Sequence, residues 1–330
     1  MVSGWYHIPL DRTTTDGIID FASRRIMNTT RIISILVLAA APVFAANETI
    51  STYLALGDSV PFGMNVTLLP PYSTQVPTAS EFIGYPETVA ALEIPIHFGK
   101  EINAACPGET SGSFLNINVP DNGCNFPHPQ PPPLQPIPPA KPEFLHTPYT
   151  KAQMDFALLQ LAPNNHVNLV TLSIGANDIL MILPQLEQCL KTPGCDPASI
   201  LDPVLGTYAS NLVQILTSIR LQYQGTLILM TYYSPAPALD TVTQALNGTM
   251  LQVASQLNAQ PGMPQISIAD GYTAFWAVSA PFGGDACQAG LLIKLPPGPY
   301  TTTPCDIHPS PLGRDILAAT VVLAQRSNGR

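Results

Sequence analysis

Short runs of apolar residues recur along this chain. In the longer segments between these runs, apolar residues occur at every third or fourth position. Runs typical of buried strands lie at residues 53–56, 167–174, 226–231 and 266–269, with a weaker fifth at 96–103. Helical spacing is present at residues 81–92, 150–161, 200–223, 241–257 and 312–325. This alternation predicts an α/β fold in which a parallel sheet is covered by helices on both faces.

The pattern contains no internal repeat and no linker, so we expect one domain over residues 47–330. Its one irregular part is a proline-rich insertion at residues 126–148, which contains ten prolines. Such a segment excludes a helix or a central strand and favours extended backbone. Two interpretations remain open: a surface excursion between sheet elements, or a wall or lid beside a functional site.

The N-terminal region has the features of a processing segment. Arg24, Arg25 and Arg31 precede an apolar stretch at residues 32–41, and small residues follow Pro42. This predicts an N-terminal extension and secretory signal over residues 1–46, with the signal peptide at about 27–45 and cleavage after Ala45. An uncleaved anchor is the alternative, but the stretch is short for a membrane span. We therefore expect a secreted or periplasmic protein without a stable membrane span in the mature chain.

All the cysteines follow the predicted signal: Cys106, Cys124, Cys189, Cys195, Cys287 and Cys305. An even number in an exported chain predicts disulfides. Pairing in sequence order is the simplest arrangement, which joins Cys106 to Cys124, Cys189 to Cys195, and Cys287 to Cys305. Zinc binding is the alternative, but the sequence has no Cys-x-x-Cys pair. We expect no metal.

The charge balance narrows the range of partners. Charged residues make up 11% of the chain, and the formal net charge is −9. This argues against nucleic acid, because proteins that bind it carry clustered lysine and arginine. We expect a monomer that acts on a small molecule.

Candidate chemistry begins where the first apolar run ends, at Gly57-Asp58-Ser59. A serine there lies at the carboxyl edge of a parallel sheet, where open α/β folds bind ligands. The segment is either a nucleophile turn or a turn with a helix cap. Near the other end of the chain, His308 follows Asp306 by two residues and precedes the last helix, which suits a general base. The other histidines lack such context: His7, His97, His128, His146 and His166.

Two further loops contain hydrogen-bond donors for an oxyanion. Gly108 lies in Cys106-Pro107-Gly108-Glu109-Thr110-Ser111, where a glycine leaves its main-chain amide sterically open. Asn177 follows the strongest predicted strand in Gly175-Ala176-Asn177-Asp178, and its side-chain amide can donate. Each loop also fits a strand-to-helix turn with an N-cap residue.

In this order and at strand ends, the four blocks resemble the GDSL, or SGNH, hydrolase family over about residues 52–313. The resemblance implies a three-layer α/β/α sandwich around a mostly parallel five-stranded, flavodoxin-like sheet. It implies that Ser59 is the nucleophile and that His308 is the general base and then the general acid. The implied oxyanion hole consists of the Ser59 and Gly108 main-chain amides and the Asn177 side chain.

One position departs from the family pattern. The family usually has an aspartate three residues before its histidine, and Cys305 occupies that position here. Either Asp306 or a main-chain carbonyl near Cys305 would then orient the imidazole. Bridges at Cys106 and Cys305 would hold the oxyanion loop and the histidine loop in place.

The resemblance implies an exported serine hydrolase of carboxylic esters that needs no cofactor and forms an acyl-enzyme. Short-chain acyl, lipid and acetylated-glycan esters all remain open as substrates. An acyltransferase on the same fold and a non-catalytic exported binding protein are the alternatives. Five aromatic residues line an acyl pocket or belong to the core: Phe62, Phe82, Tyr85, Trp276 and Phe282.

Overall fold

A computed structural model describes residues 51–328, apart from residues 76, 94–98, 129–135, 143, 300 and 302. All of these belong to one unit of the chain, Thr49–Arg330, which is distinct from Met1–Glu48. The predicted signal peptide, His7 and His97 therefore lie outside the described residues.

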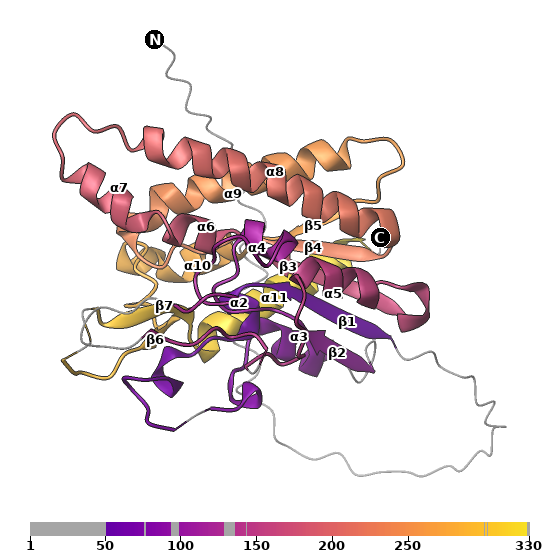
Figure 1. The fold of residues 1–330 in the computed structure, drawn as a ribbon, viewed down its shortest axis with the longest axis horizontal. Helices are drawn as coiled ribbons and strands as arrows, with labels where there is room; N and C mark the ends of the chain where they lie inside the picture. Colours follow the sequence, from indigo (N-terminus) through magenta and orange to yellow (C-terminus); the bar gives the residue numbers. More distant parts are fainter. Residues whose placement is uncertain are drawn as a thin grey trace. The chain divides into compact units, whose positions relative to one another are not determined.

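A single parallel sheet with the strand order β2-β1-β3-β4-β5 forms the centre of the fold (Figure 1). Its strands are β1 (Thr52–Gly57), β2 (Lys100–Asn103), β3 (Val167–Ser173), β4 (Thr226–Met230) and β5 (Ile266–Ala269). All five predicted runs contain a strand, which confirms the predicted fold class. In this order the chain reverses its direction of winding between β1 and β3, and doubly wound sheets bind ligands at the carboxyl ends of such strands.

Helices cover both faces of the sheet. One face carries α3 (Tyr85–Glu93), α10 (Gly271–Ser279) and α11 (Pro311–Asn328). The other carries α4 (Ser111–Leu115), α5 (Gln153–Gln160), α8 (Ala198–Gln222) and α9 (Asp240–Asn258), of which α8 and α9 lie together in Figure 1. Shorter helices are α2 (Ser59–Phe62), α6 (Ala176–Leu180) and α7 (Leu183–Leu190). Single 3-10 turns lie at Val66–Leu68, Ala79–Glu81, Pro163–Asn165, Pro237–Leu239 and Ala280–Phe282.

The central strands β1, β3 and β4 are nearly continuous apolar runs because both faces of the sheet are buried there. Leu54, Leu56, Leu169, Leu172 and Leu229 are all fully buried. Because successive residues of a strand point to opposite faces, each central strand contacts both helical layers. Burying a side chain of this size contributes about 1.5–3 kcal/mol, so the central strands provide a rigid frame for the loops at their ends.

Two parts of the fold differ from a simple strand-helix alternation. A short antiparallel pair, β6 (Leu292–Lys294) and β7 (Cys305–Pro309), precedes the last helix. The alternation of polar and apolar residues in these two segments is too short for the sequence to predict a strand pair, and β7 ends in a proline. In the described part of the proline-rich insertion there is no helix and no extended strand, only a bridge between His128 and Ile137.

No helix within the described ranges has the length and apolar character needed to cross a membrane.

Candidate active site

Ser59 is the first residue of α2, directly beyond the carboxyl end of β1. The preceding turn requires a glycine at residue 57, where φ is +134° and an added Cβ would lie 1.9 Å from the carbonyl oxygen of Ser173. The Asp58 amide donates to that same carbonyl at 3.1 Å. β1 therefore delivers Ser59 to the sheet edge beside β3, at the point where the winding reverses.

Asp58 fixes the conformation of this turn. Its carboxylate is fully buried and accepts hydrogen bonds from the Val60 amide at 3.0 Å and from the Tyr232 hydroxyl. Burial raises the pKa of Asp58 to about 6, although both hydrogen bonds favour the charged form. Asp58 therefore anchors the segment that presents Ser59.

His308 approaches Ser59 from β7, across 249 residues of sequence. Its Nε2 atom lies 2.8 Å from the Ser59 hydroxyl oxygen, and its Nδ1 atom lies 2.5 Å from Oδ2 of Asp306. The partner of Nδ1 is thus the Asp306 carboxylate. The sequence left two possible partners for the His308 imidazole, Asp306 or a main-chain carbonyl near Cys305. In the structure the partner is the carboxylate of Asp306, two residues upstream.

The pKa shifts of this pair follow from its burial and its contact. Burial lowers the pKa of His308, but the charge and hydrogen bond of Asp306 outweigh this and leave the pKa above its ordinary value. Burial raises the pKa of Asp306, and here the charge and hydrogen bond of His308 outweigh it, so this pKa is lowered. Both shifts favour an imidazolium beside a carboxylate.

Three contacts hold the histidine segment against the rest of the fold. The Tyr233 hydroxyl donates to the carbonyl of Ile307 at 2.7 Å. The disulfide Cys287–Cys305 attaches the start of β7 to the preceding loop. The Ser310 amide donates to the carbonyl of Leu291 at 2.8 Å. The position of His308 is therefore set from both sides of the residue.

The two predicted donors, Gly108 and Asn177, line the same cavity as Ser59 and His308. Gly108 has φ +82°, and an added Cβ would lie 2.3 Å from main-chain atoms of Asn122. The Asn177 Nδ2 atom donates to the carbonyl of Glu109 at 3.1 Å, which leaves its second N–H available. The main-chain N–H groups of Ser59 and Gly108 form no hydrogen bond with the described part of the chain. Three donors are thus available at this end of the sheet.

Asn122 connects the two donor loops, and sequence reasoning missed it. Its main-chain amide donates to the carbonyl of Gly108 at 2.8 Å, and its Nδ2 atom donates to Oδ1 of Asn177 at 3.0 Å. Its main-chain and side-chain oxygens each lie 3.0 Å from Nδ1 of His128. An isolated asparagine in a loop carries no sequence pattern that reveals such a role.

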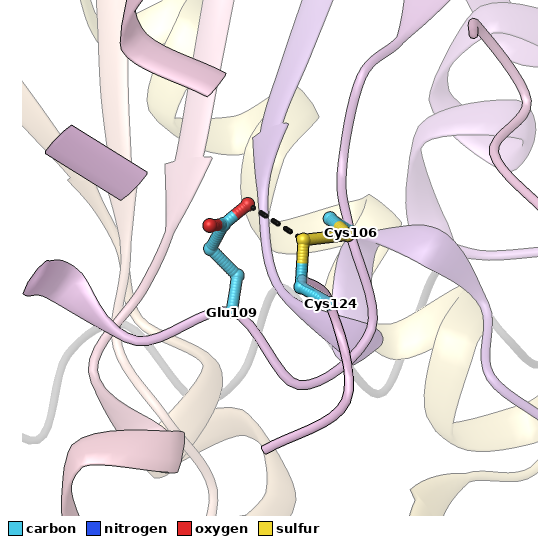
Figure 2. Close-up of side chains that lie close together, drawn as sticks. All are labelled: Cys106, Glu109 and Cys124. Carbon is cyan, nitrogen blue, oxygen red and sulfur yellow. Dashed lines mark hydrogen bonds between the residues drawn. A yellow bond between two sulfur atoms is a disulfide. The ribbon is translucent and has the colours of Figure 1, made fainter. Parts of the chain in front are cut away.

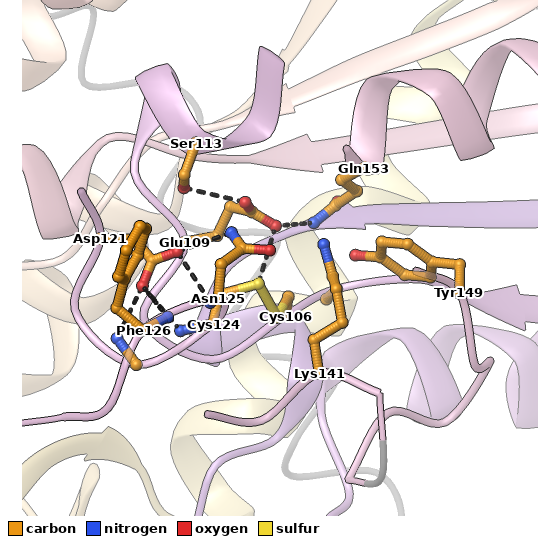
Figure 3. The surroundings of a disulfide bond; sticks show 12 residues. Cys106, Glu109, Ser113, Asp121, Cys124, Asn125, Phe126, Lys141, Tyr149 and Gln153 are labelled. Carbon is orange, nitrogen blue, oxygen red and sulfur yellow. Dashed lines mark hydrogen bonds between the residues drawn. A yellow bond between two sulfur atoms is a disulfide. The ribbon is translucent and has the colours of Figure 1, made fainter. Parts of the chain in front are cut away.

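Glu109 and Gln153 form a second connection, which is fully buried (Figure 3). Gln153 exchanges two hydrogen bonds with the main chain of Gly57, at 2.6 and 2.9 Å, and donates to Oε2 of Glu109 at 2.9 Å. The other carboxylate oxygen accepts from the Ser113 hydroxyl at 2.8 Å. Burial raises the pKa of Glu109 to about 7, against the opposing charge of Lys141. The turn before Ser59 and the loop of Gly108 are therefore joined through one amide.

The disulfides confirm the predicted pairing in sequence order: Cys106–Cys124, Cys189–Cys195 and Cys287–Cys305. Oε2 of Glu109 lies 3.2 Å from the sulfur of Cys124. Figure 2 marks this contact with a dashed line. That sulfur has no proton to donate, so this is a sulfur–oxygen contact unless Glu109 itself holds the proton. The cluster of Cys106, Glu109 and Cys124 has a spacing suitable for metal ligands, but neither sulfur is a free thiolate.

A cavity of about 460 Å³ opens beside Ser59. Ile137, Pro138 and Ala140 of the proline-rich insertion line it, so this segment forms a wall beside the serine. Of the aromatic residues considered from the sequence, Phe62 and Phe82 line the cavity. Tyr85 is buried in the core, while Trp276 and Phe282 lie about half exposed.

No family model matches the sequence, and no curated protein matches it. Solved structures with a similar fold include a lipase from a goat rumen metagenome, which is 16% identical with a TM-score of 0.47 over 83% of this chain and 96% of that chain. A phospholipase A1 from Streptomyces albidoflavus is 15% identical, with a TM-score of 0.47 over 83% of this chain and 98% of that chain. A member of the lipolytic G-D-S-L family from Veillonella parvula is 14% identical, with a TM-score of 0.43 over 83% and 97% of the two chains.

Proposed function

We propose that this protein is a serine hydrolase of carboxylic esters of the SGNH type. The observation that carries the proposal is the continuous contact from the Ser59 hydroxyl to His308 and on to Asp306, at 2.8 and 2.5 Å. A hydroxyl, an imidazole and a carboxylate in this order form the arrangement that activates a serine for attack.

Each step of ester hydrolysis has a side chain or main-chain group positioned to carry it out. Ser59 Oγ forms a bond to the ester carbonyl carbon as its proton moves to Nε2 of His308. The electron pair displaced onto the carbonyl oxygen is stabilised by the N–H groups of Ser59, Gly108 and Asn177. When the tetrahedral intermediate collapses, the carbon–alkoxy bond breaks, and His308 returns the proton to the leaving alcohol.

Water then completes the reaction. It loses a proton to His308 and attacks the acyl-enzyme, which releases the carboxylic acid and restores the Ser59 hydroxyl. Throughout the cycle the Asp306 carboxylate accepts a hydrogen bond from the Nδ1–H group of His308, which keeps Nε2 directed at Ser59 and stabilises the imidazolium. No step requires a metal or an organic cofactor.

Hydrolysis of p-nitrophenyl butyrate by the wild type and by Ser59→Ala tests the proposal. Removing the nucleophile of such a triad typically reduces turnover by about a millionfold, so the variant is expected to fall to background. Ser80→Ala, at an exposed serine on a surface 3-10 turn, is the matched control and should keep the wild-type rate. A Ser59→Ala protein that retains wild-type turnover would exclude the proposal.

We also propose that residues 47–330 form a single hydrolase domain and that the enzyme is exported after removal of a signal ending near Ala45. Three disulfides support export, because such bonds persist in oxidising compartments. Edman sequencing of protein recovered outside the cytoplasm should begin at Ala46, and an intact Met1 or Met27 there would contradict this.

A further inference from the structure

Two cavities, rather than one, meet at the candidate catalytic residues. Beside the cavity of about 460 Å³ lies a smaller one of about 80 Å³. Ser59, Leu180, Ile307 and His308 line both of them. An ester whose carbonyl carbon contacts Ser59 would therefore have one space on each side for its two substituents.

The lining of the smaller cavity is mostly apolar. Val242 and Leu246 of α9 line it, together with Ile179 of α6. A cavity of about 150 Å³ is known to hold benzene, and a water molecule takes up about 30 Å³ of liquid. A volume of about 80 Å³ therefore has room for an arm of about two or three carbon atoms.

The larger cavity has the size of a small-molecule site. Its volume of about 460 Å³ lies within the range of ligand pockets. Met64, Val66 and Leu69 form part of one wall, and Ile137 and Pro138 of the proline-rich insertion form part of another. A long apolar chain would bury its methylene groups against these walls, at about fourfold in affinity for each group.

Charge narrows the substrate class further. Among the described lining residues of both cavities there is no lysine, arginine or glutamate, and Asp306 and His308 pair with each other. The other histidine of the lining is His128, whose pKa is lowered by burial, which favours the neutral imidazole. A phosphate or carboxylate on the substrate would lose water in either cavity without gaining a cationic partner.

We propose that the substrate is an uncharged ester with two apolar arms of unequal length. The arm of about two or three carbons occupies the smaller cavity, and the longer arm occupies the larger one. This inference rests on the proposed ester hydrolase function and adds the substrate class.

Four simple esters test the arms separately: ethyl acetate, hexyl acetate, ethyl hexanoate and hexyl hexanoate, measured by pH-stat below their solubility limits. Either hexyl acetate or ethyl hexanoate is expected to have a kcat/KM at least tenfold above those of both ethyl acetate and hexyl hexanoate. The better of the two identifies which side of the ester takes the long arm. Hexanoyloxyacetate, the charged counterpart of ethyl hexanoate, should be cleaved at least tenfold less efficiently than ethyl hexanoate once both rates are divided by those of alkaline hydrolysis.

Substitutions in the residues that line the two cavities test whether the cavities cause the preference for esters with arms of unequal length. Val242→Ala widens the smaller cavity and is expected to raise kcat/KM for hexyl hexanoate relative to the preferred ester, whereas Val242→Phe should lower both. Val66→Trp fills part of the larger cavity and should reduce the advantage of the hexyl arm. Leu251→Ala, at a more exposed residue on the same helix α9, is the control and should leave the pattern unchanged.

The outcomes separate this inference from the function on which it rests. If no ester is cleaved in a Ser59-dependent manner, the proposed function itself is wrong. If cleavage depends on Ser59 but hexyl hexanoate matches the better unequal ester, or the charged ester matches its neutral counterpart, only the substrate class is overturned. Val242 variants that leave the preference of a folded enzyme unchanged would also overturn it.

Discussion

In the proposed mechanism, the protonation state of His308 decides whether Ser59 can be deprotonated. The imidazole acts as a base only when it is neutral, and Asp306 holds its pKa above the ordinary value. We therefore expect kcat/KM for a neutral ester to rise with pH through a pKa above about 6.5.

Asp306→Asn tests the cause of this shift. Removing the carboxylate charge should move the acidic limb of the pH profile to lower pH and reduce kcat/KM by about 10⁴. Asp315→Asn, at a side chain that is 58% exposed on α11, is the matched control. It should change neither the position of the acidic limb nor the value of kcat/KM. An Asp306→Asn enzyme with an unshifted limb would show that another group sets the pKa of His308.

At the scale of single residues, the sequence is sufficient to predict the candidate site residues but not the residues that hold them in place. Ser59, Gly108, Asn177 and His308 lie in short blocks with recognisable neighbours at strand ends. Gln153 contacts Gly57 from a position 96 residues away in the sequence. It lies in helix α5, whose sequence pattern predicts a helix but no contact with Gly57. Such contacts depend on tertiary packing, which leaves no local signature in the sequence.

Among the elements, the loops beyond β2 and the β6–β7 pair determine the geometry of the site. The disulfide Cys106–Cys124 closes the loop of Gly108, and Cys287–Cys305 holds the strand that bears His308. Misplacing a catalytic group by about 1 Å can cost about a hundredfold in rate. These two bridges therefore constrain the positions that catalysis requires.

The paired variant Cys287→Ser/Cys305→Ser should reduce kcat/KM at least tenfold while the fold is retained. It should also lower the free energy of unfolding by about 3 kcal/mol, as expected for a bridge across 18 residues. Circular dichroism and urea unfolding separate the two effects. Cys189→Ser/Cys195→Ser, which opens a bridge across 6 residues between α7 and the loop that follows it, is the control. A folded Cys287→Ser/Cys305→Ser enzyme with wild-type kcat/KM would contradict the positioning role.

The elements differ in how well their sequences predict them. The strands β1, β3 and β4 could be predicted because burial on both faces produces continuous apolar runs, as at Leu54 and Leu172. The edge strand β2 begins at the exposed Lys100, which explains why its run is weaker. The β6–β7 pair could not be predicted, since β6 has three residues and β7 alternates polar and apolar positions over only five. The strand that carries His308 is therefore among the elements that the sequence predicts least well.

For the molecule as a whole, buried acids control how stability depends on pH. Burial raises the pKa of Asp58 to about 6 and that of Glu109 to about 7, and burial beside Glu87 also raises the pKa of Glu101. The folded state thus holds protons that the unfolded chain releases above about pH 4, so these groups reduce stability as the pH rises toward 7.

The other titrating groups modify this trend. The raised pKa of His308 acts in the same direction, because its stabilisation is complete below about pH 6.5 and is lost as the pH rises through the folded pKa. The lowered pKa of Asp306 acts oppositely, but its contribution is lost only as the pH falls from about 4 through its lowered folded pKa. The net charge of −9 adds repulsion at neutral pH.

We therefore expect Tm to fall as the pH rises from 5 to 8, which differential scanning calorimetry measures. Glu109→Gln removes one buried acid and should make this decrease shallower. Asp196→Asn, at an exposed residue before α8, is the control and should reproduce the wild-type slope. A Tm that stays constant or rises across this range would contradict the burial of these carboxyl groups in their acidic forms.

The central claim is that Ser59 is a nucleophile activated by His308. Stopped-flow mixing with p-nitrophenyl acetate tests it most directly, with mass analysis of the intact and the digested protein quenched during the reaction. The account predicts a burst of p-nitrophenol of about one equivalent per enzyme when deacylation is limiting. Under that condition it also predicts an added acetyl group on the peptide containing Ser59 that is absent from Ser59→Ala and His308→Ala. A burst without an acylated Ser59, or with the acetyl group on another residue, would contradict it.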